Sequence, residues 1–129
     1  MTRRRAISGL GALAAATLLA GCLGKNPNTA SGPPVATINV KETEMKITPA
    51  NPTIKKPGVV EFKVQNAGHI VHALSVKGSG GLIQTQQIQA GKSATLRASL
   101  NKPGKYRWYC PVGDHADRGM RGTVTVRGA

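Results

Sequence analysis

Three side chains near the C-terminus could bind one soft metal ion together. Cys110, His115 and Met120 follow one another at equal spacing, with four residues between neighbours. A loop of that length can fold back and present all three side chains to one point. His72 supplies a second imidazole from farther up the chain. One thiolate, two imidazoles and a thioether form a soft donor set, typical of blue-copper electron-transfer sites.

Two stretches of alternating sequence must position these side chains. In the first, His72 begins a row that continues with Leu74 and Val76 on one face of an extended strand. In the second, residues 106–110, Cys110 ends such a row. Successive side chains of a strand point to opposite faces, so both candidate ligands belong to core-facing rows. Each lies at a strand end near a loop, and two such ends can meet at one pole of a sandwich.

The rest of the chain after residue 34 is also rich in strand patterns. Alternating apolar residues occupy four further segments: 36–40, 60–65, 94–100 and 123–126. Gly, Pro and Asn clusters separate these segments, and no stretch there shows helical periodicity with caps. Residues 44–54 contain two prolines and fit an edge strand or an irregular crossover between sheets. The sequence therefore predicts an all-β fold, an antiparallel β-sandwich.

Two segments resemble the cupredoxin family. Residues 66–72, Asn-Ala-Gly-His-Ile-Val-His, are similar to its pattern Asn-x-Gly-x-x-x-His. The segment from Tyr109 through Met120 to Val126 is similar to its Cys–His–Met loop and final strand. The resemblance covers most of residues 35–127. It implies a Greek-key β-sandwich of about eight strands that carries outer-sphere electron transfer.

The resemblance also implies one type 1 copper ion per chain and a role for each donor. It makes His72 the first imidazole ligand, Cys110 the thiolate, His115 the second imidazole and Met120 the axial ligand. Zinc could use the Cys and the two His, but a thioether is a poor fourth ligand for it.

The chain departs from the family pattern at two places close to these ligands. Ala73 stands where many relatives have Asn, and Gly113-Asp114 replaces Pro-Gly before the second His. Asp114 could hydrogen-bond within the loop or lower the reduction potential by its charge. Of the other nearby residues, we expect His69 to be exposed in a turn, Trp108 to belong to the core and Tyr109 to face away from the thiolate.

The N-terminus has the features of a bacterial lipoprotein signal peptide. Arginines at positions 3–5 precede a small, apolar run over residues 6–20, which is too short for a stable membrane anchor. The run ends in Leu-Ala-Gly-Cys, which resembles a lipobox with Cys22 as the lipidated residue. An ordinary secretory signal with a chance Cys is the alternative. We expect an exported protein, lipid-anchored to a bacterial membrane and facing the periplasm or the cell exterior.

These features divide the chain into three parts. Residues 1–21 form the signal peptide, residues 22–34 a flexible tether rich in Gly, Asn and Pro, and residues 35–129 the cupredoxin domain. Lipidation of Cys22 would leave Cys110 as the one free thiol in an oxidising compartment. Core burial and metal ligation both explain such a thiol, and a disulfide between the two cysteines is a third possibility.

The chain is strongly basic. It has 18 Lys and Arg against 5 Asp and Glu, a formal net charge of +13. The signal peptide holds three of the arginines and no acidic residue, which leaves 15 against 5, or +10. This charge favours anionic partners or surfaces, or serves solubility. One Trp, one Phe and two Tyr offer few rings for base stacking, so we expect no nucleic-acid binding.

The donor set favours a one-electron carrier that is not an enzyme. Multicopper oxidases and nitrite reductases need further His ligands, and this chain has three His in all. A binuclear copper centre needs a second Cys in the ligand loop, which is absent. The alternative is a copper carrier that delivers metal to another exported protein, for which an exposed Met- and His-rich ligand set would be typical.

We expect a monomer whose redox partner docks beside His115, the ligand edge nearest to solvent. Arginines in and beside the loop favour an acidic partner, such as a cytochrome or an oxidase domain. The candidate docking residues are Pro111, Val112, Gly113, Arg118 and Arg121.

Overall fold

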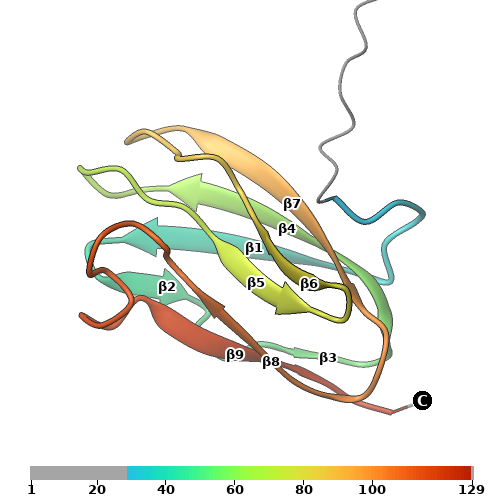
Figure 1. Cartoon of the computed structure of the whole chain (residues 1–129). Coiled ribbons are helices and arrows are strands. Elements are labelled where there is room, and N and C mark those ends of the chain that lie inside the picture. The colour runs from blue at the N-terminus through green and yellow to red at the C-terminus, as the bar shows by residue number, and fades with distance from the viewer. Residues whose placement is uncertain (1–28, 129) are drawn as a thin grey trace, which may run out of the picture.

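The computed structural model describes residues 29–128 (Figure 1). The predicted signal peptide, the lipidation candidate Cys22 and the first part of the predicted tether lie outside the described residues. Within the described residues, no helix is long and apolar enough to cross a membrane.

In the described part of the chain, nine strands form two packed sheets (Figure 1). They are β1 (Ala36–Thr43), β2 (Lys46–Thr48), β3 (Thr53–Ile54), β4 (Gly58–Asn66), β5 (Ser75–Gly78), β6 (Gly81–Gln84), β7 (Ser93–Leu100), β8 (Gly104–Tyr109) and β9 (Arg121–Val126). The first sheet has the order β2-β1-β4-β7 and the second the order β3-β9-β8-β5-β6. The predicted all-β sandwich is confirmed, with nine strands in these residues where about eight were expected. It is not purely antiparallel as predicted, because β1 pairs with β4 and β3 pairs with β9 in parallel.

The segment 44–54 crosses between the sheets, one of the two alternatives for it. It contributes β2 to the edge of the first sheet and β3 to the edge of the second. Between them, the Ala50 carbonyl accepts the indole N–H of Trp108 at 2.8 Å. Any side chain at Gly122 would collide with that carbonyl and with the indole. Glycine at 122 therefore lets the crossover lie directly against β9.

The core lies between the sheets and follows the predicted alternation. Val60, Phe62 and Val64 of β4 are at most 1% exposed, while the residues between them are not fully buried. The Phe62 and Trp108 rings meet across the core with centroids 5.6 Å apart and planes tilted by 55°. Such a pair contributes about 1 kcal/mol beyond its burial. Trp108 is fully buried, as expected of a core residue.

The scaffold brings the candidate ligands to one end of the sandwich. Cys110 directly follows β8, and Met120 directly precedes β9, which pairs with β8. His72 lies before β5, which pairs with β8 on its other side. The predicted row starting at His72 is buried, but the strand itself begins only at Ser75. His72 instead forms an isolated antiparallel bridge with Ile88.

Candidate metal centre

Three buried ligand atoms meet at this end of the sandwich. One nitrogen from each of His72 and His115 and the sulfur of Cys110 all lie within 4.8 Å of one another. Cys110 Sγ is 3.5 Å from His115 Nδ1, and the two imidazole rings lie edge to face with centroids 5.1 Å apart. His72 and Cys110 are fully buried, whereas His115 is 7% exposed. His115 is thus the ligand candidate nearest to solvent, as the sequence predicted.

The segment 110–120, called the ligand loop below, is held by its own backbone. The Cys110 N–H donates to the Met120 carbonyl at 2.9 Å, which closes the loop. The Met120 N–H donates to the His115 carbonyl at 3.0 Å. Gly113 and Gly119 have φ of +48° and +122°, which glycine adopts without the strain of a side chain. Met120 is fully buried, so the loop turns its thioether into the protein.

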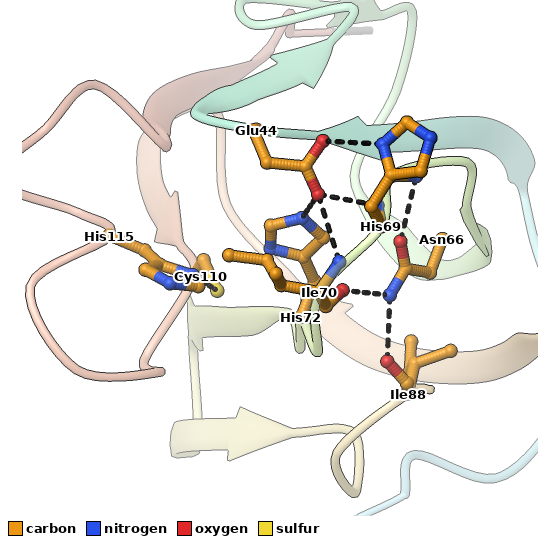
Figure 2. Close-up of polar contacts among 9 residues, drawn as sticks. Glu44, Asn66, His69, Ile70, His72, Ile88, Cys110 and His115 are labelled. Atoms are coloured by element: carbon orange, nitrogen blue, oxygen red, sulfur yellow. Dashed lines mark hydrogen bonds and ion pairs between the residues drawn. The ribbon is translucent and has the colours of Figure 1, made fainter. Parts of the chain in front are cut away.

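The segment 66–75, called the His72 arm, is held by side chains from distant strands and loops. The fully buried Asn66 donates from Nδ2 to the carbonyls of Ile70 and Ile88, both at 2.8 Å (Figure 2). Its Oδ1 accepts the N–H of Gly68 at 2.9 Å. His72 and Ile88 exchange two backbone hydrogen bonds. The Asn-x-Gly-x-x-x-His pattern therefore describes a turn tied internally and to residue 88.

Glu44 also holds the His72 arm, and no spacing in the sequence indicated this role. Its Oε1 accepts the backbone N–H groups of His69 at 2.6 Å and Ile70 at 3.0 Å (Figure 2). The same oxygen lies 3.4 Å from His72 Nε2. Any side chain at Gly68 would collide with the carboxylate. The His69 side chain is 95% exposed, as predicted, and contacts only the outer oxygen of Glu44, at 3.6 Å.

Burial sets the protonation of the ligand candidates before any metal binds. It lowers the pKa of His72, against the opposing contact with Glu44, and so favours the neutral imidazole that ligates metals. Burial also raises the pKa of the Cys110 thiol, and the nearby Glu42 adds to this effect. The free thiol is therefore protonated at neutral pH, and metal binding must displace that proton.

Glu42 is a second acidic residue that sequence reasoning missed. It lies fully buried on the inner face of β1, after Ile38 and Val40. Neither carboxylate oxygen has a hydrogen-bond partner among the residues that the structure describes. Burial raises its pKa to about 8. The alternation of β1 does place residue 42 inside, and that was the available signal.

The two departures from the family pattern leave the centre intact. Ala73 is buried without a polar group, and Thr85 Oγ1 accepts the N–H of the next residue, Leu74, at 3.0 Å. Asp114 is exposed, and its carbonyl accepts the N–H of Arg118. Their side chains form an ion pair at 3.9 Å. Asp114 thus bonds within the loop, one of the two roles expected for it.

Four of the five candidate docking residues lie on the ligand loop with His115, and the fifth, Arg121, directly follows it as the first residue of β9. Pro111 and Val112 are half-buried, and Gly113, Arg118 and Arg121 are exposed. A groove continues from Arg121 over the outer face of the second sheet, lined by Lys77, Arg107 and Tyr109 among others. Tyr109 therefore faces outward, away from the site of the Cys110 sulfur.

The donor set fits one type 1 copper ion. Within residues 29–128, the buried nitrogens of His72 have no hydrogen-bond partner, which is costly unless a metal or another group uses them. Two imidazoles and a thiolate at these separations, with a buried thioether in the same loop, match the trigonal set with a weak axial Met.

Solved structures with the same fold are blue-copper proteins and oxidases. Auracyanin B has a TM-score of 0.68 at 19% identity, covering 78% of this chain and 94% of its own. Auracyanin A, a "blue" copper protein from Chloroflexus aurantiacus, has a TM-score of 0.62 at 17% identity, covering 74% and 100%. The multicopper oxidase mgLAC has a TM-score of 0.60 at 18% identity, covering 72% and 39%. The likeness establishes the cupredoxin fold.

Sequence comparison is more specific. No curated protein matches the chain. One family model, MSMEG_3727_PQQ-assoc, described as PQQ-associated, matches residues 4–129, almost the whole chain. The protein is therefore a cupredoxin-fold member of this PQQ-associated family.

Proposed function

We propose that this protein is a blue-copper electron carrier that passes single electrons between redox partners. The observation that carries the proposal is the buried cluster of His72, Cys110 and His115, with ligand atoms within 4.8 Å. Bound copper would supply a one-electron couple between its cuprous and cupric states. Met120 would complete the donor set with a weakly binding thioether.

The protein holds these donors in fixed positions and shields them from water. Cys110, His72 and Met120 are fully buried, so water cannot reach the metal from their side. The hydrogen bonds of the ligand loop and of the His72 arm fix the donors in the metal-free protein. Donors that are already in place need little movement when the charge of the site changes, which favours rapid electron transfer.

The buried ligands favour an electron carrier over a protein that delivers copper. A delivery protein must hand its metal to another site, which requires ligands accessible to the acceptor. Among the candidate ligands only His115 has an exposed edge, and that edge amounts to 7% of the residue. An edge of this size suits electron transfer, and it offers an acceptor protein only one of the candidate ligands.

The partner in this proposal has an acidic docking surface and approaches His115. Half-buried Pro111 and Val112 provide a small apolar contact area, and the exposed Arg118 and Arg121 provide positive charge around it. The family description, PQQ-associated, supports a partner from a PQQ-dependent redox system. We further propose export and lipid anchoring at Cys22, which intact mass spectrometry of membrane-extracted protein tests directly.

Optical spectroscopy tests the main proposal. Purified protein given Cu(II) should turn intensely blue through thiolate-to-copper charge transfer, with one copper per chain. Cys110→Ser should abolish the colour, whereas His69→Ala should keep it because that ring is exposed. A colourless wild-type protein that binds one zinc ion would refute the proposal.

A further inference from the structure

The Glu44 carboxylate lies just beyond β1 and reaches across to the His72 arm. Figure 2 shows the His72 ring between this carboxylate and the pair formed by Cys110 and His115. The oxygen that accepts the two backbone N–H groups of the arm is also the one that faces His72 Nε2 at 3.4 Å. One acidic side chain thus contacts both the backbone and the ligand ring of the arm.

The His72 ring has no other polar contact for its outer nitrogen. The ring is fully buried, and neither nitrogen forms a complete hydrogen bond within the described part of the chain. The 3.4 Å separation from Glu44 is a contact that a small shift would turn into a hydrogen bond. A histidine that ligates a metal through one nitrogen nearly always donates its other N–H to a carboxylate, carbonyl or water. Glu44 is placed to accept that N–H.

We propose that Glu44 is a positioning residue of the copper site, which accepts the Nε2–H of His72, leaves Nδ1 free for the metal and stabilises the oxidised state by its negative charge. This inference rests on the proposed function, because it assigns a role toward the same copper ion.

The charge of Glu44 is available for this role. The carboxylate accepts the backbone N–H groups of His69 and Ile70, and such hydrogen bonds stabilise its charged form. Among the described residues no Lys or Arg forms an ion pair with it. Its field therefore acts on His72 and the metal without a neutralising partner, although its partial exposure to water screens it. The oxidised site carries one more positive charge than the reduced site, so a nearby carboxylate favours oxidation.

The competing explanation is that Glu44 only stabilises the backbone of the arm. Two substitutions distinguish this explanation from the proposal. Glu44→Gln keeps a hydrogen-bond acceptor of the same size and removes the charge. Glu44→Leu removes both. Glu61→Gln is the matched control for net charge, since Glu61 pairs with Arg97 at 3.0 Å instead of with the arm. It lies five residues before Asn66 on β4, roughly 16 Å along the strand.

The first measurement is the reduction potential of the copper-loaded full chain. We expect Glu44→Gln to stay blue and to shift the redox equilibrium tenfold or more toward the reduced state, which is about 59 mV for a one-electron couple. Glu61→Gln should shift it less than twofold. Equal shifts in the two variants, or none in Glu44→Gln, would overturn the electrostatic role.

The second measurement uses the metal-free protein, and so tests the positioning role even if the copper proposal fails. Nitrogen-15 NMR at a pH where His72 is neutral should show the proton on Nε2 in the wild type and in Glu44→Gln. Glu44→Leu should give a mixture of both tautomers. A wild-type ring with its proton on Nδ1 would overturn the inference. A wild type with the expected tautomer but no blue colour would instead refute the proposed function.

Discussion

The His72 arm and the ligand loop bring donors to the same point, but they are held by different parts of the chain. Hydrogen bonds within eleven consecutive residues close the loop. The arm depends on Asn66 bonding to Ile88, 22 residues away, and on Glu44, 25 residues before His69. The conformation of the loop is therefore determined by contiguous residues, whereas that of the arm depends on elements distant in the sequence.

The largest expected effect comes from breaking the arm at Asn66. Asn66→Ala removes three hydrogen bonds and leaves the buried Ile88 carbonyl without its side-chain donor. At about 1 kcal/mol for each bond and a similar penalty for the unpaired group, the loss of stability should reach about 3–4 kcal/mol. Urea unfolding of the metal-free protein measures it.

Asn51→Ala is the matched control for that experiment. Asn51 accepts one exposed hydrogen bond, from the Thr123 N–H at 3.1 Å, so its loss should cost less than about 1 kcal/mol. Copper binding should weaken in Asn66→Ala and stay unchanged in Asn51→Ala. Equal costs for the two variants would mean that the arm does not depend on Asn66.

The next effect concerns Glu42, a buried carboxyl group whose ionised form raises the pKa of Cys110 in the loop. Its pKa in the folded protein, about 8, lies above the ordinary value of 4.5, so the folded state binds the proton more tightly than the unfolded state. Its contribution to stability is therefore full below about pH 4.5 and is lost as the pH rises to about 8. Glu42→Gln cannot ionise and should escape this loss.

The difference between wild type and Glu42→Gln should be smallest below about pH 4.5. Above pH 8 it should favour the variant by at most about 5 kcal/mol, since the pKa rises from 4.5 to about 8 and one pKa unit is worth about 1.4 kcal/mol. Urea unfolding of the metal-free proteins across this range measures it. Other titrating groups, His72 included, are present in both proteins and cancel in the difference. A difference that does not change with pH would show that Glu42 is not buried as a carboxyl group.

The loop could be predicted in detail from sequence because its ligands, turns and closing strand are contiguous. Residues 110–120 contain the Cys, the His, the Met and both glycines that turn the chain. The strand alternation also predicted the buried faces of β4 and β8. Glu44 could not be predicted, since its role arises only when the turn after β1 meets the end of β4, a contact fixed by the parallel pairing of these strands. The same pairing places Glu42 beside Asn66.

A smaller effect is expected from the axial position of the loop. Met120 is fully buried, and a weak thioether favours Cu(I), whereas a harder amide oxygen favours Cu(II). Met120→Gln should keep copper and shift the redox equilibrium roughly tenfold toward the oxidised state, about 59 mV lower in potential. Protein-film voltammetry measures this shift. An unchanged or raised potential would mean that Met120 is not the axial ligand.

The smallest effect is expected at the surface of the loop, which, unlike the arm, would contact the redox partner. Arg118 and Arg121 are exposed beside His115 and add positive charge where an acidic partner would approach. Arg118→Glu combined with Arg121→Glu should slow electron transfer to an acidic partner several-fold at low salt and flatten its salt dependence, because screening already removes such steering at high salt. Lys55→Glu combined with Lys56→Glu is the matched control, since these exposed lysines follow β3, away from the ligand loop, and change the net charge equally. Stopped-flow kinetics across ionic strength separates the two pairs. If both double variants slow the reaction equally, the overall charge of the protein steers the partner, and the arginines beside His115 do not define the docking surface.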